Sequence, residues 1–161
     1  MLPALSKVSL FHDLCADELA LLEAVFEPYA CRRGTVIFEQ GDPAEFMYLI
    51  LSGEVQIQFK PYDGPAIIVA HVVPDGVCGW SAVVGNLTYT SGAVCEEDCD
   101  ALRIRGEHLR KLCLEYPETG RIILDRLARV VSTRWKDAPA QVRAILTQGV
   151  LTGNRLKKTR P

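Results

Sequence analysis

The chain has 161 residues, of which 48% are hydrophobic and 24% charged, a composition that suits one soluble globular domain with a single core. A formal net charge of −2 argues against a nucleic-acid-binding protein, because such surfaces are usually basic. No apolar run approaches the ~20 residues of a membrane helix, and the N-terminus lacks a signal-peptide pattern. We therefore expect a cytoplasmic protein without membrane contact.

Cysteine usage supports the same compartment. The six cysteines are Cys15, Cys31, Cys78, Cys95, Cys99 and Cys113. None form a CxxC pair and most have apolar neighbours, so we expect reduced, buried thiols. Cys95 and Cys99 enclose a short acidic turn, where a disulfide or a metal ligand pair is a weaker alternative.

The first thirty residues are predicted to be helical. Leu14, Leu21, Leu22 and Val25 fall near helical spacing, and acidic residues lie early, where they suit the helix dipole. Pro28 is expected to end this helix.

From residue 29 onward, short β-branched or aromatic runs alternate with Gly, Pro and Asp, which is typical of strands and turns. The predicted strands cover residues 35–38, 46–51, 54–59, 66–73, 92–95 and 100–104. Apolar and polar residues alternate in the third of these, which predicts a strand with one solvent-exposed face. Short strands in this order indicate a sandwich or a barrel.

After Gly106 the helical period returns. The predicted helices cover residues 107–115, 117–136 and 141–148, followed by a basic tail. The order of helix, strands and long helix predicts an α+β fold with its helices at the two ends. We expect one domain over residues 1–136, including the long helix, and a short helix with a basic tail over 137–161.

With these elements placed, the sequence resembles the cyclic nucleotide-binding domains of Crp/Fnr-like sensors, kinase regulatory subunits and gated channels. The resemblance rests on the segments 38–42 (Phe-Glu-Gln-Gly-Asp) and 48–55 (Tyr-Leu-Ile-Leu-Ser-Gly-Glu-Val) and on an N-terminal helix pattern over 10–19. It covers about residues 5 to 136. It implies a double-stranded β-helix, or jelly-roll, sandwich with an N-terminal helix and a long C-terminal helix.

The family's phosphate-binding cassette reads Gly-Glu-x-Ala-Leu, followed later by Arg-x-Ala. This chain has Gly79, Trp80, Ser81, Ala82 and Val83 at the first part. At the second part it has Thr90, Ser91 and Gly92. Trp80 therefore replaces the acidic residue that would bond the ribose, and Thr90 replaces the arginine that would pair with the phosphate.

The cassette-like stretch has no basic residue, since no lysine or arginine occurs between Lys60 and Arg103. The loss of two charge-assisted contacts, at about 1.5–3 kcal/mol each, predicts at least a hundredfold weaker binding of cAMP or cGMP. The N-terminus of a short helix near Ser81 could still hold an anion through its free N–H groups. The sequence alone assigns no cofactor. The candidate ligands are a cyclic nucleotide (cAMP or cGMP) and another small molecule.

Two tryptophans have competing interpretations. Trp80 either stacks on a ligand or fills the pocket as core, and the second interpretation is favoured because large aromatics are more often packed. Trp135, next to Arg134, is either a lid over the base side of the ligand or a packing residue of the helix end.

The long C-terminal helix carries an apolar stripe of Ile123, Leu127 and Val130, with Leu124 and Val131 beside it. In the resembling family this helix pairs with its twofold mate, so we expect a homodimer through it. Only about two dozen residues follow Lys136, which are too few for a helix-turn-helix domain, so we expect no direct DNA binding by this chain.

No catalytic or metal site is predicted. His12, His71 and His108 have no ligand spacing, and the apolar run around His71 predicts a buried, hydrogen-bonded histidine. No Ser-His-Asp, paired-carboxylate or Gly-rich nucleotide-binding arrangement occurs in a convincing context. The leading hypothesis is thus a non-enzymatic sensor module. The alternatives are a structural or dimerisation module with a decayed pocket, the effector domain of a truncated Crp/Fnr-type regulator, and a cysteine-based redox sensor.

Overall fold

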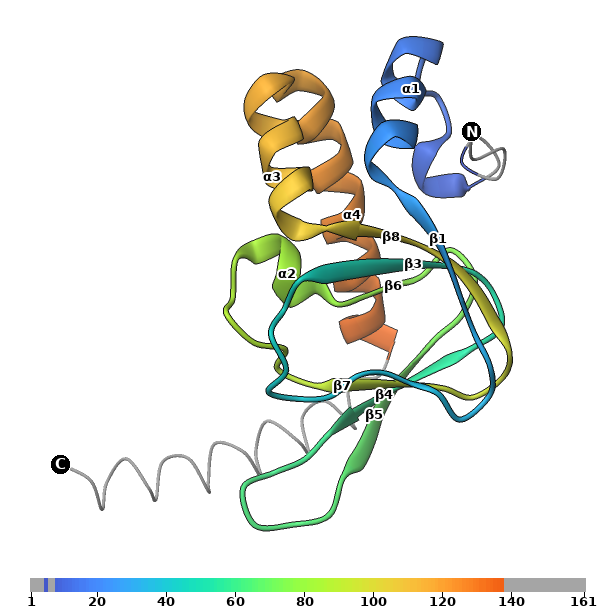
Figure 1. Cartoon of the computed structure of the whole chain (residues 1–161), viewed down its shortest axis with the longest axis vertical. Coiled ribbons are helices and arrows are strands. Elements are labelled where there is room, and N and C mark those ends of the chain that lie inside the picture. The colour runs from blue at the N-terminus through green and yellow to red at the C-terminus, as the bar shows by residue number, and fades with distance from the viewer. Residues whose placement is uncertain (1–4, 6–7, 138–161) are drawn as a thin grey trace, which may run out of the picture.

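Two antiparallel sheets of four strands each face one another in the structure, a computed structural model that describes residues 5 and 8–137 (Figure 1). Sheet A has the order β1-β8-β3-β6 and sheet B the order β2-β7-β4-β5. The strands are β1 (Glu27–Cys31), β2 (Val36–Phe38), β3 (Phe46–Ser52), β4 (Val55–Phe59), β5 (Ile67–Val72), β6 (Val77–Cys78), β7 (Gly92–Cys95) and β8 (Cys99–Arg105). Apart from the consecutive pair β4–β5, neighbours in each sheet come from distant parts of the chain, as the crossovers of a jelly roll require.

The helices lie mainly on one side of this sandwich, against sheet A (Figure 1). They are a short 3-10 helix (Ser9–Phe11), α1 (Ala16–Val25), α2 (Trp80–Val84), α3 (Gly106–Glu115) and α4 (Pro117–Asp137). The guanidinium of Arg126 on α4 donates hydrogen bonds to the carbonyl oxygens of Leu10, at 2.8 Å, and of His12. The N-terminal segment is thereby held against the long helix.

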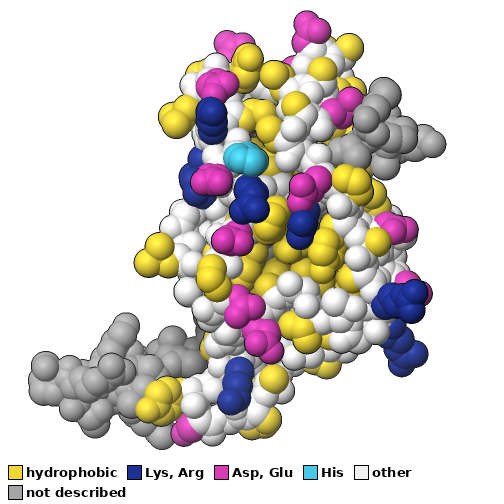
Figure 2. Space-filling model, in the orientation of Figure 1, with side chains coloured by type: hydrophobic (Ala, Val, Ile, Leu, Met, Phe, Trp, Pro, Cys, Tyr) yellow, Lys and Arg dark blue, Asp and Glu magenta, His cyan; other side chains and the backbone are white. Residues whose placement is uncertain are grey.

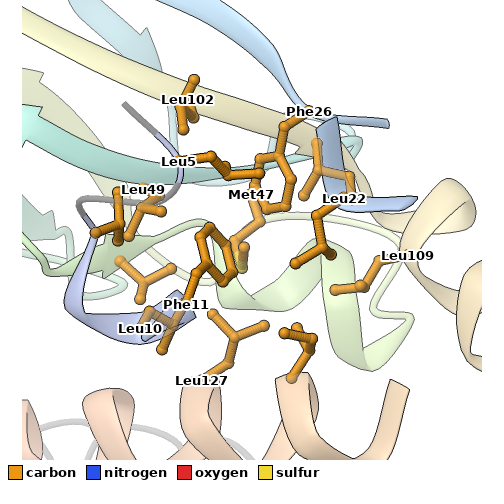
Figure 3. Close-up of a cluster of buried hydrophobic side chains, with 14 of the residues drawn as sticks. Leu5, Leu10, Phe11, Leu22, Phe26, Met47, Leu49, Leu102, Leu109 and Leu127 are labelled. Atoms are coloured by element: carbon orange, nitrogen blue, oxygen red, sulfur yellow. The ribbon is translucent and has the colours of Figure 1, made fainter. Parts of the chain in front are cut away.

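Strand alternation produces two apolar cores. On β3, Met47 and Leu49 point to the helices, whereas Tyr48 and Ile50 point between the sheets. The helical core joins side chains of sheet A to those of the helices, and Figure 3 shows this cluster. Its largest fully buried members include Phe11, Leu22, Leu102, Leu109, Ile123 and Leu127. The second core fills the space between the two sheets.

The α+β jelly-roll sandwich predicted from sequence is confirmed, and the predicted strands and helices after residue 35 agree with the structure to within a few residues. The expectation of helix up to Pro28 is wrong at its end, because α1 stops at Val25 and Pro28 lies inside β1. β1 is the edge strand of sheet A, where a proline without an N–H is tolerated. The two-residue β6 gave no periodic signal. The expected helix at 141–148 and the tail lie outside the described residues.

The expectation of reduced, buried thiols is wrong for three of the six cysteines. Cys31 of β1 and Cys95 of β7 form a disulfide that joins the two sheets, although 64 positions separate them. Cys15 is exposed, whereas Cys78 and Cys99 are buried and Cys113 is intermediate.

None of the helices in the described part of the chain is both long and apolar enough to cross a bilayer.

Reduction of the Cys31–Cys95 disulfide is predicted to destabilise the domain. Cross-linking a loop of this length removes entropy from the unfolded chain, worth about 4 kcal/mol in the chain-entropy description. Urea unfolding with and without reductant should show a lower midpoint for the reduced protein, and Cys31→Ser should reproduce that loss. Cys15→Ser, at the N-cap of α1 where serine is a favoured residue, is the control and should not lower the midpoint. A count of six reactive thiols in unreduced, denatured protein would contradict the bridge.

Candidate functional site

The cassette-like segment surrounds α2, a single helical turn held between two left-handed glycines. Gly79 precedes the helix with φ of +83°, and a Cβ there would come within 2.6 Å of the carbonyl oxygen of Phe46. Gly85 follows the helix with φ of +86°, and its N–H donates to the carbonyl oxygen of Ser81. Glycine is thus required at position 79 both by its conformation and by the close backbone of β3.

The middle of α2 is packed into the protein. Ser81, Ala82 and Val83 are buried, and the carbonyl oxygen of Ala82 accepts a 2.6 Å hydrogen bond from the guanidinium of Arg110 on α3. A Cβ on Gly106, the first residue of α3, would collide with the same carbonyl. These contacts fix the cassette helix against β3 and the start of α3.

The second half of the cassette lies in the loop before β7. Thr90, assigned from the sequence to the position of the family's phosphate-binding arginine, is exposed, and Ser91 is half-buried. The backbone of Tyr89 is hydrogen-bonded in both directions to the turn at 41–42, since its N–H donates to Asp42 and its carbonyl accepts from Gly41. The loop is therefore anchored immediately beside Thr90.

Tyr89 is a core residue of this site that sequence reasoning missed. Its ring is 5% exposed and stacks on Phe38, with ring centroids 3.8 Å apart and planes 15° apart. Its hydroxyl donates to the carbonyl oxygen of Phe46 at 2.6 Å and accepts from the Phe46 N–H at 3.0 Å. Burial raises the pKa of this phenol above its usual value. In the sequence Tyr89 stands between two threonines, Thr88 and Thr90, and no apolar pattern marks it as a core residue.

Aromatic side chains occupy the space between the sheets near the cassette. Tyr48 lies beside Phe38, with ring centroids 6.0 Å apart, and Tyr29 meets Tyr48 edge-on at 5.1 Å. Trp80, by contrast, is half-buried and packs against the helical core on the other side of sheet A. The indole at position 80 therefore contacts the helices and not the space between the sheets.

Two arginines just beyond the cation-free stretch lie close to the site. The guanidinium of Arg103 is 4.2 Å from the ring centroid of Phe46, and that of Arg105 is 4.6 Å from it. Arg103 is also paired with Glu27, with Nε and Oε1 2.6 Å apart. Arg105 makes no ion pair with the described residues. Because Phe46 touches both Gly79 and Tyr89 through its backbone, the fold brings positive charge to the neighbourhood of the cassette.

Residues predicted on the long helix have different surroundings. Ile123 and Leu127 are fully buried in the helical core of their own chain, and Val130 packs against that core. Leu124 and Val131 are half-buried. Arg134 and Trp135 belong to α4, but their side chains lie outside the described part of the chain.

A shallow hollow of about 480 Å³ opens at another place, where β1 meets the start of β8. Its lining comes from residues 29–32, Thr35 and residues 98–100. None of the cassette-like residues lines it.

The interpretation of His71 as a buried core histidine is wrong, because 45% of its side-chain surface is exposed. It pairs with Gln56 across the antiparallel β4–β5 ladder, so the two side chains share the polar outer face of sheet B. Its ring lies 3.0 Å from Glu54 and 3.1 Å from Glu96.

Comparison with known protein families agrees with this architecture. Residues 30–116, more than half of the chain, match the family model described as the cyclic nucleotide-binding domain. The chain therefore belongs to the cyclic nucleotide-binding domain family, and the resemblance predicted from sequence is confirmed.

Among individual proteins, a CRP-like cAMP-activated global transcriptional regulator of Mycobacterium tuberculosis (strain CDC 1551 / Oshkosh) is 26% identical over 125 residues. The match covers 78% of this chain and 56% of the regulator, so the chain spans about half the length of that relative. A putative cyclic nucleotide-binding protein from Geobacter metallireducens GS-15 superimposes with a TM-score of 0.73 at 24% identity, over 83% of this chain and 98% of that one.

A more distant structure shares the fold. The regulatory subunit of a cAMP-independent protein kinase A from Trypanosoma brucei, in a mutant form bound to cAMP, has a TM-score of 0.65 at 18% identity. The superposition covers 78% of this chain and 43% of the subunit.

Tyr89→Phe is predicted to destabilise the domain by about 1–3 kcal/mol, because the Phe46 N–H and carbonyl would lose their shared partner in a buried place. Chemical denaturation of both proteins measures the difference. Tyr62→Phe, at a position 76% exposed, is the matched control and should change the unfolding free energy by less than about 0.5 kcal/mol. Equal effects at the two positions would contradict the structural role of the Tyr89 hydroxyl.

Proposed function

We propose that this chain is a non-enzymatic regulatory domain of the cyclic nucleotide-binding family in which binding of cAMP or cGMP is weak or lost. The observation that carries the proposal is the pair of exchanges in the cassette. Trp80 packs toward the helices at the ribose position, and Thr90 offers an exposed neutral hydroxyl at the phosphate position. The scaffold of the cassette is kept, whereas both of its charged contacts are replaced.

The aromatic packing between the sheets supports the same conclusion. Tyr89 fills space next to the cassette and stacks on Phe38, so a purine would compete with an aromatic pair that is already buried. Arg105 supplies a nearby cation without a carboxylate partner among the described residues. A small anionic ligand other than a cyclic nucleotide is therefore the better candidate for this site.

A domain with the same fold has been solved with cAMP bound. This form of the cAMP-independent kinase subunit carries three substitutions, one of which replaces threonine by arginine. We propose that Thr90 limits cAMP binding in the present chain.

Restoring the two family residues is predicted to create cyclic-nucleotide binding. Trp80→Glu with Thr90→Arg adds one contact to the ribose and one to the phosphate, so the affinity for cAMP should rise by more than about a hundredfold. Calorimetric titration with cAMP and cGMP measures the affinity directly. A thermal-shift series provides a second readout, since a ligand at a hundred times its Kd stabilises the native state by about 2.7 kcal/mol.

The control variant is Trp80→Glu with Thr88→Arg, which adds the same charges with the arginine two residues away. Thr90→Arg alone tests the phosphate contact at an exposed position where folding is not at risk. Tight binding of cAMP by the unaltered chain would contradict the proposal. No gain in the restored variant, when it is folded, would show that the aromatic cluster closes the site.

The homodimer expected from sequence is part of this proposal, but the contact is proposed on a different side of α4 from the one predicted. Since Ile123 and Leu127 are buried in their own chain, a partner helix would meet Leu124, Ala128 and Val131, which share one side of α4. Two such stripes packed together would form an isologous contact.

Val131→Glu is predicted to weaken self-association at least tenfold, because it places a charge in the apolar contact. Analytical ultracentrifugation across micromolar concentrations measures the change. Asp125→Arg, at an exposed position of α4 outside the stripe, is the control and should weaken association much less than Val131→Glu. A wild-type monomer at these concentrations would overturn the dimer proposal.

The output of the domain is proposed to be an effect on a protein partner, with no direct DNA contact by the described residues. On the face seen in Figure 2, acidic and basic side chains are interspersed, and no large basic area is visible among the coloured residues.

A cytoplasmic location belongs to the proposal as well, and the Cys31–Cys95 disulfide is the observation against it. Alkylation of thiols in intact cells would distinguish a reduced from an oxidised protein.

A further inference from the structure

Three side chains with metal-binding atoms converge on the outer face of sheet B. The Nδ1 atom of His71 lies 3.0 Å from Oε2 of Glu54 and 3.1 Å from Oε1 of Glu96. One donor atom from each of the three residues falls within 4.8 Å of the other two. This cluster lies at the end of β7, whereas the cassette loop leads into the beginning of that strand.

Strand register produces this convergence. β4 lies between β7 and β5 in sheet B, and Val55 pairs with Cys95 on one side and with Val72 on the other. Glu54 and Glu96 are the next residues outward, joined by a 2.8 Å hydrogen bond from the Glu96 N–H to the Glu54 carbonyl. His71, on β5, is paired with Gln56, on β4. Three neighbouring strands thus each place one ligand-type side chain at the same edge of the face.

The two carboxylates converge on one imidazole nitrogen, since Nδ1 of His71 lies 3.0 Å from Oε2 of Glu54 and 3.1 Å from Oε1 of Glu96. A cation held between two carboxylates offsets the repulsion between their negative charges. The imidazole of His71 faces both carboxyl groups with a nitrogen that can either carry a proton or bind a metal.

Two glutamine side chains next to the cluster hold Glu96 in place. The Gln56 amide donates a 2.6 Å hydrogen bond to Oε1 of Glu96, the same oxygen that faces His71. The Gln58 amide in turn donates to the Gln56 amide oxygen at 3.0 Å. Hydrogen bonds of this kind orient the ligands of metal sites in proteins.

We propose that Glu54, His71 and Glu96 bind a divalent first-row transition-metal ion, with Zn²⁺ as the probe ion. Ligand atoms about 2.1 Å from a tetrahedral ion are about 3.4 Å apart. The two nitrogen–oxygen distances in the cluster, 3.0 and 3.1 Å, would have to lengthen by only a few tenths of an ångström to admit the ion. The partial exposure of His71 leaves room for water to complete the coordination.

The donor set decides the class of ion. A site of carboxylates alone would suit Mg²⁺ or Ca²⁺, whereas an imidazole nitrogen favours zinc and its neighbours. The chain offers an internal contrast in His108 and Glu107, an exposed pair on α3 that is 4.0 Å apart. That pair has a single carboxylate and is not part of a three-residue cluster among the described residues.

A sulfur cluster nearby is the competing site. Cys31, Cys95 and Cys99 also have their sulfur atoms within 4.8 Å of one another. Two of these sulfurs are joined in the disulfide, and burial raises the pKa of the Cys99 thiol. A thiolate site would require reduction of the disulfide first, so the oxidised protein separates the two sites.

The test uses the whole chain without a histidine tag and with its disulfide intact. Calorimetric titration with Zn²⁺ should show one ion bound per chain, and Zn²⁺ should raise the melting temperature, whereas Mg²⁺ at the same concentration should not. His71→Ala, Glu54→Gln and Glu96→Gln should each weaken Zn²⁺ binding at least tenfold. His108→Ala is the matched control and should leave the affinity unchanged.

Melting of the metal-free variants keeps the test decisive. All four substitutions lie at partly exposed positions, so we expect the variants to fold. Without metal, their melting temperatures should differ little from that of the wild type. With Zn²⁺, the melting temperature should rise only in the wild type and in the control His108→Ala. Absence of Zn²⁺ binding by the wild type at millimolar concentration would overturn the proposal. Unchanged affinity in the three site variants would do the same. A thiolate charge-transfer band with Co²⁺ that disappears in Cys99→Ser would assign the ion to the sulfur cluster instead.

Discussion

The position of the cassette helix depends on two contacts in which main chain meets main chain without an intervening side chain. Gly79 lets α2 start against the carbonyl of Phe46, and Gly106 lets α3 start against the carbonyl of Ala82. Arg110 then satisfies that Ala82 carbonyl, and Tyr89 satisfies both backbone groups of Phe46. Because backbone atoms cannot yield as flexible side chains do, α2, β3 and the start of α3 form one tightly connected unit.

This connection gives the domain a physical route from the cassette to the long helix. α3 carries both Gly106 and Arg110, and α4 follows it after a single residue. Ile123 and Leu127 of α4 lie in the same apolar core as Val83 of α2. A ligand that shifts α2 would therefore have to shift α3 or open a gap in a packed core. The coupling is built from contacts of α2 with β3 and α3 inside the protein.

How much of this could be predicted depended on whether the signal was local. Gly79 and Gly92 marked the cassette in the sequence because the motif around each of them is local, and β7 was predicted with its observed bounds. The Cys31–Cys95 bridge was not predictable, since the partners are 64 positions apart and have no shared pattern. His71 was misplaced because its apolar neighbours hid the fact that β5 is an edge strand with an exposed face. Tyr89 was missed since its role comes from Phe38 and Phe46, which are distant in sequence.

The disulfide also has a consequence for the outer border of sheet A. β1 is the edge strand there, and it is held by its ladder to β8 and by the bond from Cys31 to β7. An unpaired edge is a template on which strands of other molecules can add. When the bridge is cut, β1 is held by its ladder to β8, by the Glu27–Arg103 ion pair and by the packing of Tyr29 on Tyr48, and its departure would uncover the inner edge of β8. The tendency of this domain to aggregate through intermolecular strand pairing should therefore follow the oxidation state of its surroundings.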